Sequence, residues 1–153
     1  MSAKVVRQIG HFELVRELGR GAMGRVFLAR WLSGDSVKVV ALKVLHAAFT
    51  RDEGIVYRLR QESRAASVLK HDNIVQAIDF GAADGHVYFA MEYVKGKTLH
   101  EVLSRWGALS ERPALRITRQ IALALQHANR HKIVHRDIKP SNILVTKTGL
   151  AKL

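Results

Sequence analysis

The chain has no cysteine among its 153 residues and only two prolines, Pro113 and Pro140. Without cysteine there can be no disulfide framework, thiolate zinc site or cysteine nucleophile. No apolar run approaches the roughly 20 residues that a membrane-spanning helix needs. Residues 1–10 lack the apolar segment of a secretory signal. We therefore expect a soluble, cytoplasmic protein without disulfides.

Acidic residues are also scarce, with 13 Asp and Glu against 25 Lys and Arg, which gives a net charge of +12. This surplus excludes an acidic disordered tail and favours phosphate-bearing ligands, nucleic acid or anionic membranes as partners. Nucleic-acid binding is supported by the charge alone, because no nucleic-acid motif or interleaved aromatic pattern accompanies it. We expect no specific nucleic-acid partner.

Hydrophobic periodicity predicts a sheet in the first part of the chain. Alternating and apolar runs bounded by turn residues predict five strands, over residues 12–18, 25–31, 37–45, 74–80 and 86–93. Between the third and fourth strands, apolar residues recur at spacings of three, four and seven and predict a helix over 52–70.

The second part of the chain is predicted to be mainly helical. Thr98 and Glu101 have the spacing of a capping box, and Ser110 can cap a longer helix. The predicted fold class is α+β in two lobes. Residues 1–94 form a five-stranded antiparallel lobe with one helix, and residues 95–153 form the first part of a helical lobe.

Three glycines, Gly19, Gly21 and Gly24, form a G-x-G-x-x-G run. Glycine lets backbone amides approach phosphate oxygens closely because no Cβ intervenes. A dinucleotide-binding loop would be followed by a helix, whereas residues 25–29 are predicted to form a strand. The run is therefore expected at a hairpin tip, either as a phosphate-binding loop or as a glycine-rich turn without a ligand.

One lysine, Lys43, lies in an otherwise apolar strand, and Glu62 lies on the apolar stripe of the predicted helix. A buried unpaired charge is costly, so each side chain needs a partner. We expect Lys43 and Glu62 to pair and to position a phosphate together. The alternative is that both long side chains extend to solvent.

The segment from His135 to Asn142 is a compact polar loop between two short extended pieces. In such a loop Asp137 can accept a hydroxyl proton, and Lys139 can neutralise a phosphoryl group in transfer. The amide oxygen of Asn142 can bind Mg²⁺. A solvated polar turn would not select this combination and spacing.

Together these motifs resemble those of the protein kinases, and most closely those of bacterial eukaryotic-type serine/threonine kinases. The matching motifs are the glycine run with Val26 after it, the segment Val40 to Lys43, and the loop His135–Asn142. Leu42 replaces the usual isoleucine of the lysine motif. The resemblance extends from about His11 to the last residue.

The resemblance implies ATP and Mg²⁺ as cofactors and a protein serine or threonine hydroxyl as substrate. It implies that the glycines cover the phosphates of ATP, and that Lys43 contacts the α- and β-phosphates while Glu62 holds it. The residues implied to bind adenine are Val26, Ala41 and Leu144, with Met91 as gatekeeper and Glu92 and Val94 offering backbone groups. The implied catalytic residues are Asp137 as base and Lys139 at the γ-phosphate, with Asn142 as a Mg²⁺ ligand.

The family also has a D-F-G motif whose aspartate binds Mg²⁺, after the loop of Asn142. The only such triplet here, Asp79-Phe80-Gly81, precedes that loop, so we interpret it as coincidence at a strand-to-turn junction. Leu153 is expected to lie just before the true position. The hypotheses are therefore a truncated kinase domain, inactive alone, or a pseudokinase-like nucleotide-binding interaction module.

Overall fold

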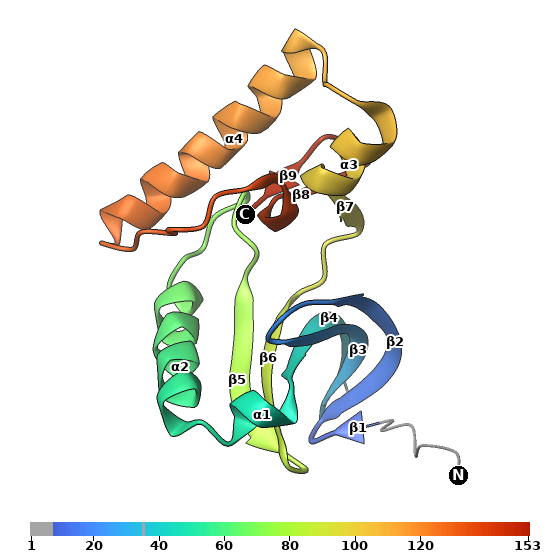
Figure 1. Cartoon of the computed structure of the whole chain (residues 1–153), viewed down its shortest axis with the longest axis vertical. Helices are drawn as coiled ribbons and strands as arrows, with labels where there is room; N and C mark the ends of the chain where they lie inside the picture. The colour runs from blue at the N-terminus through green and yellow to red at the C-terminus, as the bar shows by residue number, and fades with distance from the viewer. Residues whose placement is uncertain (1–7, 35) are drawn as a thin grey trace. The chain divides into compact units, whose positions relative to one another are not determined.

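The computed structural model describes residues 8–34 and 36–153, apart from the side chains of Glu62 and Ala65. The chain divides into two compact units (Figure 1). The first contains the residues up to Ser67 together with Ala77–Tyr93, and the second contains Val68–Gln76 together with Val94–Leu153. Each unit has its own sheet.

The first unit contains a six-stranded antiparallel sheet in the order β1-β2-β3-β4-β6-β5. Its strands are β1 (Gln8–Ile9), β2 (Phe12–Arg20), β3 (Gly24–Ser33), β4 (Ser36–Leu45), β5 (Ala77–Ala83) and β6 (His86–Glu92). Two helices, α1 (Ala47–Thr50) and α2 (Glu53–Ser67), follow β4. The α+β class is confirmed, but the expected count of five strands is wrong. The extra strand, β1, has two residues, which is too short for alternation to show.

Alternation along β4 separates two faces of this sheet. Val40, Leu42 and Val44 are buried in the core with residues of β1, β2, β3 and β6. Ala41, Lys43 and Leu45 point to the opposite face, and the last two line a cavity together with side chains of α2. The face that carries Lys43 is therefore the one next to α2.

The second unit is built from a small sheet and two helices. The three-stranded sheet has the order β7-β8-β9, with β7 (Gly96–Thr98), β8 (Leu144–Thr146) and β9 (Ala151–Lys152). The helices are α3 (Leu99–Trp106), α4 (Glu111–Arg130) and a 3₁₀ turn, η1 (Pro140–Asn142).

Side-chain capping differs between the two helices. The predicted capping box of α3 is confirmed: Glu101 donates its backbone N–H to Thr98 Oγ1 over 3.1 Å, and Thr98 donates its own to Glu101 Oε2 over 2.7 Å. Ser110 occupies the N-cap position of α4, but its hydroxyl makes no capping hydrogen bond.

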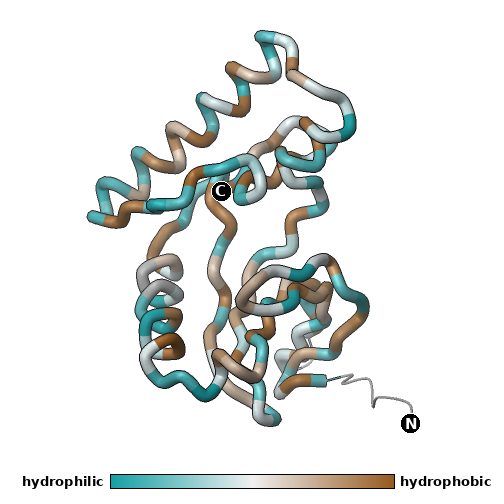
Figure 2. Tube along the Cα trace, in the orientation of Figure 1, coloured by the Kyte–Doolittle hydropathy of each residue, from teal (hydrophilic) through white to brown (hydrophobic). Residues whose placement is uncertain are grey.

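One face of α4 forms the core of the second unit. Ile117, Ile121, Ala124 and Ala128 are buried at spacings of three and four. Ile117 and Ile121 pack against Ile143, which directly precedes β8, and against Ala151 of β9. Hydrophobic and hydrophilic stretches alternate along α4 (Figure 2). In the described ranges, no helix has both the length and the hydropathy to cross a membrane.

Asn73 connects three segments of the second unit. Its side chain is 7% exposed, and its Nδ2 donates to Gln120 Oε1 over 2.9 Å and to the Ala151 carbonyl over 2.8 Å. Gln120 in turn accepts from the Ala151 N–H and donates to the Gly149 carbonyl, both over 2.9 Å. The backbone of Leu153 bonds to Asn73 and Val75. These bonds tie residues 73–75, α4 and the β8–β9 hairpin together.

Three histidines meet at the end of α4. The His127 ring lies 5.1 Å from that of His71 and 4.7 Å from that of His131, between centroids. The Nε2 atom of His127 is buried and has no hydrogen-bond partner among the residues that the structure describes. Its partial removal from water lowers the pKa of His127, and the positive charges of His131, His71 and Arg130 lower it further.

Replacing Asn73 by alanine is expected to destabilise the second unit. The change leaves the Ala151 carbonyl without its buried donor, which costs about 1–3 kcal/mol. Urea unfolding followed by circular dichroism measures the loss. The matched control is Asn129→Ala on the exposed surface of α4, expected to change stability by less than about 0.5 kcal/mol. Equal effects of the two substitutions would contradict the role of Asn73.

Acid is expected to destabilise the protein through His127. Its pKa is lower in the folded state, so the unfolded chain binds the proton more readily, and stability is lost as pH falls through the unfolded value of about 6.5. His127→Phe keeps a ring and removes the titration. Its melting temperature is expected to fall less than that of the parent between about pH 7.5 and pH 5.5. The melting temperature of the exposed control His11→Phe is expected to change with pH as that of the parent does. If the melting temperature of His127→Phe falls with pH as steeply as that of the parent, this account is contradicted.

Candidate functional site

The glycine run forms the tip of the β2–β3 hairpin, as the sequence predicts. Gly19 lies opposite Val26 in the ladder, and the Gly21 N–H donates to the Gly24 carbonyl over 2.8 Å to close the turn. A Cβ on Gly24 would clash with the Val44 carbonyl of β4, so this position requires glycine. At Gly19, by contrast, a Cβ would meet no atom of the described residues within 4 Å. The hairpin therefore leaves open space beside its first glycine.

His46 anchors this hairpin tip, a role that sequence reasoning missed. Its backbone N–H donates to the Met23 carbonyl over 3.0 Å, and its Nε2 lies 3.2 Å from the Gly21 carbonyl oxygen. His46 directly follows β4, so it connects the glycine run to the end of the strand that carries Lys43. No spacing or motif in the sequence signals this contact.

The sheet register brings several candidate residues onto one face. Val26 of β3 and Phe89 of β6 lie on either side of Lys43, and Met91 of β6 lies beside Ala41. Residues directly opposite each other in an antiparallel sheet share a face, as do residues two apart in one strand. Val26, Ala41, Lys43 and Met91 therefore lie on the same face.

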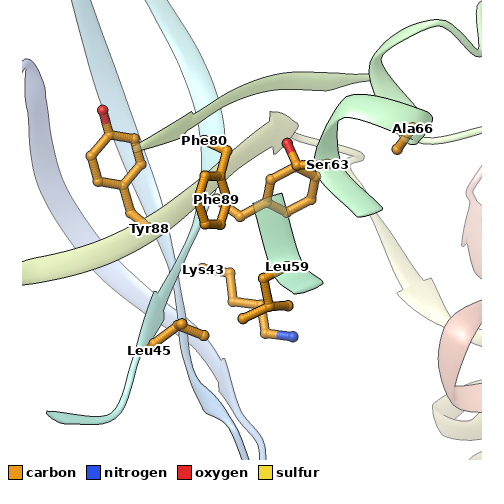
Figure 3. A pocket seen from close by; sticks show the side chains of 8 residues that line it. All are labelled: Lys43, Leu45, Leu59, Ser63, Ala66, Phe80, Tyr88 and Phe89. Carbon is orange, nitrogen blue, oxygen red and sulfur yellow. The ribbon is translucent and has the colours of Figure 1, made fainter. Parts of the chain in front are cut away.

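A cavity of about 200 Å³ lies between this face and α2. It is lined by Lys43, Leu45, Leu59, Ser63, Ala66, Phe80, Tyr88 and Phe89 (Figure 3). Lys43 makes no ion pair with any residue whose side chain the structure describes. The side chain of Glu62 lies outside the described residues, so its pairing with Lys43 stays a prediction.

The other expected adenine-binding residues are divided between the units. Glu92 ends β6 in the first unit, and Val94 and Leu144 belong to the second. Val94 is buried, and Leu144 begins β8 opposite Thr98 of β7.

The polar loop before β8 brings its three expected functional residues together. Asp137 Oδ2 lies 2.8 Å from Lys139 Nζ and accepts a hydrogen bond from Asn142 Nδ2 over 2.9 Å. Asn142 Nδ2 also donates to the Asp137 backbone carbonyl over 2.9 Å. The side chains of Asp137 and Lys139 are 59% and 51% exposed, so the group is open to solvent.

These contacts set the charge of the loop. The hydrogen bond from Lys139, followed by that from Asn142, lowers the pKa of Asp137 below its ordinary value. Asp137 is therefore a carboxylate at neutral pH. Because Asn142 uses its Nδ2 to hold Asp137, its Oδ1 has no hydrogen-bond partner within the described ranges. That oxygen is left to accept a donor or a cation.

The backbone holds this loop in an unusual shape. Arg136 has φ +65°, a left-handed conformation that is rare for a residue with a Cβ. The two neighbours of Arg136 contact each other, since the Asp137 N–H donates to His135 Nδ1 over 3.3 Å. The 3₁₀ turn η1 then begins at Pro140. After the loop, the Ile143 carbonyl accepts the Leu99 N–H over 2.7 Å. Strained backbone of this kind persists where surrounding structure fixes it, and it is frequent at functional sites.

The triplet Asp79-Phe80-Gly81 lies inside β5, an edge strand, and not at a strand-to-turn junction. Asp79 accepts a hydrogen bond from the Tyr88 hydroxyl over 3.1 Å. Burial, with the charge of Asp79, raises the pKa of Tyr88, so the hydroxyl remains a donor. Asp79 is therefore occupied within the first unit's sheet.

Comparison with known proteins agrees with these motifs. The family model for the protein kinase domain matches residues 12–153. Serine/threonine-protein kinase pkn3 of Myxococcus xanthus is 48% identical over 84% of this chain, and PrkC of Bacillus subtilis is 41% identical over 94%. The chain spans 23% and 22% of the lengths of these two relatives.

Solved structures show the same fold. A double mutant of the PknI kinase domain of Mycobacterium tuberculosis superposes with a TM-score of 0.81 at 31% identity, over 96% of this chain and 58% of that one. The fold, the motifs and the family match lead to one conclusion. The chain belongs to the protein kinase domain family.

Proposed function

We propose that this chain supplies the nucleotide-binding sheet and the catalytic loop of a serine/threonine protein kinase. The reaction transfers the γ-phosphoryl group of ATP to a serine or threonine hydroxyl of a protein. In this proposal residues 1–94 are the small lobe and residues 95–153 the beginning of the large lobe. The observation that supports it most strongly is the contact of Lys139 and Asn142 with the carboxylate of Asp137.

The glycine hairpin and Lys43 are proposed to bind the phosphates of ATP. The open space beside Gly19 lets a phosphate approach backbone amides, with Gly21 at the tip and Gly24 against β4. Lys43 has no ion-pair partner among the described side chains and is free to contact the α- and β-phosphates. Glu62 is proposed to hold Lys43 in position.

Adenine is proposed to contact the apolar side chains of Val26, Ala41 and Leu144. Val26 and Ala41 share the face of Lys43, which supports their placement on one side of the purine. The remaining proposed contacts are Leu144 on the other side, Met91 as gatekeeper, and the backbone groups of Glu92 and Val94.

In the proposed transfer, the substrate hydroxyl oxygen attacks the γ-phosphorus, the bond to the β-phosphate oxygen breaks, and the hydroxyl proton passes to Asp137. The lowered pKa of Asp137 makes it a weak base, so its main contribution is to orient the hydroxyl by accepting its hydrogen bond. Lys139, which already contacts Asp137, neutralises charge on the transferring group.

Mg²⁺ is proposed to bind at Asn142. The unpartnered Oδ1 of that side chain fits such a role, because Mg²⁺ prefers oxygen ligands. When bound, the ion neutralises charge on the β- and γ-phosphates. In these 153 residues, no Asp-Phe-Gly follows Asn142 to supply the family's second Mg²⁺ ligand.

A second candidate is supported by the carboxylate of Asp79, which is occupied by the Tyr88 hydroxyl. The 153-residue polypeptide alone would then bind nucleotide without transferring phosphate, as a pseudokinase-like interaction module. Both candidates bind a nucleotide, but only the kinase transfers a phosphoryl group to a protein.

Lys43→Ala is expected to weaken ATP binding by about 10-fold or more, because a charge-assisted contact to a phosphate contributes about 1.5–3 kcal/mol. Isothermal titration calorimetry of the full chain measures the affinity. The control Lys38→Ala removes an exposed lysine from the same strand and is expected to bind like the parent. If both variants bind ATP like the parent, the assignment of Lys43 is wrong.

The 153-residue polypeptide alone is expected to transfer no phosphate to a protein substrate above background in ATP and Mg²⁺. The physical reason is that a single neutral amide ligand, Asn142, holds the metal weakly compared with a carboxylate. Radiolabelled phosphate incorporation measures transfer. A signal from the parent that disappears in Asp137→Ala would contradict the expectation and would establish that the polypeptide is active.

A further inference from the structure

We propose that a groove between α2 and β5 binds a phosphate group. The groove has a volume of about 330 Å³ and is lined by Arg60, Ser63, Arg64 and Ser67 of α2 and by residues 77–80 of β5. None of these residues belongs to the proposed ATP-binding or catalytic set. The groove lies entirely within the first unit.

The α2 side of the groove carries two guanidinium groups on one stripe. Arg60 and Arg64 are four residues apart, so their side chains are neighbours on the helix surface. Neither makes an ion pair with a side chain in the described part of the chain. Like charges at this spacing repel each other, and an anion between them converts that repulsion into attraction. Guanidinium groups match phosphate oxygens with paired, parallel hydrogen bonds.

A serine hydroxyl on the same stripe supports a ligand with oxygen atoms. Ser63 is 9% exposed and lines the groove between the two arginines, yet its hydroxyl forms no hydrogen bond with any described residue. In the described ranges only His127 Nε2 is buried without a partner, so the Ser63 hydroxyl is open to the groove. A phosphate oxygen in the groove would accept its hydrogen bond. Figure 3 shows Ser63 on α2 with Phe80 nearby.

One arginine is already held at the groove. The guanidinium carbon of Arg60 lies 6.0 Å from the centroid of the Phe80 ring on β5, in a cation–π contact. This contact restricts the side chain before a ligand arrives, which reduces the entropy lost on binding. The aromatic ring belongs to the same wall of the groove that Asp79 lines.

Asp79 sets the charge selectivity. It brings one negative charge to a groove with two guanidinium groups, although the Tyr88 hydroxyl donates to its carboxylate. A net charge of about +1 attracts a phosphate dianion more strongly than a singly charged carboxylate. The groove is therefore expected to prefer phosphate groups over acidic side chains. The source is either a phosphorylated side chain or a free phosphate ion.

The test is a ¹⁵N NMR titration of the full chain with inorganic phosphate and, separately, with a phosphoserine peptide and its unphosphorylated form. Shifts are expected at residues 60–67 and 77–80 with both phosphate probes and not with the unphosphorylated peptide. Tighter binding of the peptide identifies a phosphorylated side chain as the natural source, and equal binding identifies the free ion. Absence of groove shifts with both phosphate probes overturns the proposal.

Variants separate the groove from the ATP site. Arg60→Gln combined with Arg64→Gln is expected to weaken phosphate binding by about 10-fold or more, since two charge-assisted contacts are lost. Ser63→Ala, a smaller change, is expected to weaken it by about threefold. The matched control Arg58→Gln lies on α2 outside the groove and is expected to bind phosphate like the parent. The spectra of the variants verify that they fold. If both groove variants then bind phosphate as tightly as the parent, the proposal is contradicted.

Discussion

The buried side chain of Asn73 is the constraint on which the second unit depends. It bonds to α4 through Gln120 and to β9 through the Ala151 carbonyl. The polar loop of Asp137 is exposed and has no core of its own, so its shape depends on the segments at its two ends. One end follows α4, and the other continues through Ile143 into β8, which pairs with β9. Because Asn73 joins both sides, it fixes the frame in which Asp137, Lys139 and Asn142 meet.

The scarcity of acidic residues explains a second feature of the molecule. With 13 acids for 25 basic residues, many cations have no acidic partner in the chain. Among the described side chains, Lys43, Arg60 and Arg64 make no ion pair, and each lines a cavity or groove. Lys139 differs because it already contacts Asp137. These three cations line the places where we propose that phosphate binds, once as part of ATP and once as a separate group.

Motif spacing predicted the local structure of the chain, because the contacts concerned lie within a few residues of each other. The capping box of α3 and the cluster of Asp137 with Asn142 span three and five residues. Contacts between distant segments could not be inferred in this way: Asn73 and Ala151 are 78 residues apart. The same contacts explain why the expected strand at residues 74–80 begins only at Ala77, since the backbone at 73–75 bonds to Leu153 instead.

The central proposal is that the chain binds ATP, with the glycine hairpin and Lys43 at its phosphates and the loop of Asp137 at the group that is transferred. The most direct measurement is the ¹⁵N NMR spectrum of the full chain during titration with ATP and Mg²⁺. The account predicts that amides of residues 19–24, of Lys43 and of residues 137–142 shift together along a single binding curve. Shifts that leave the hairpin and the loop unchanged, or that follow unrelated curves in these segments, would contradict it.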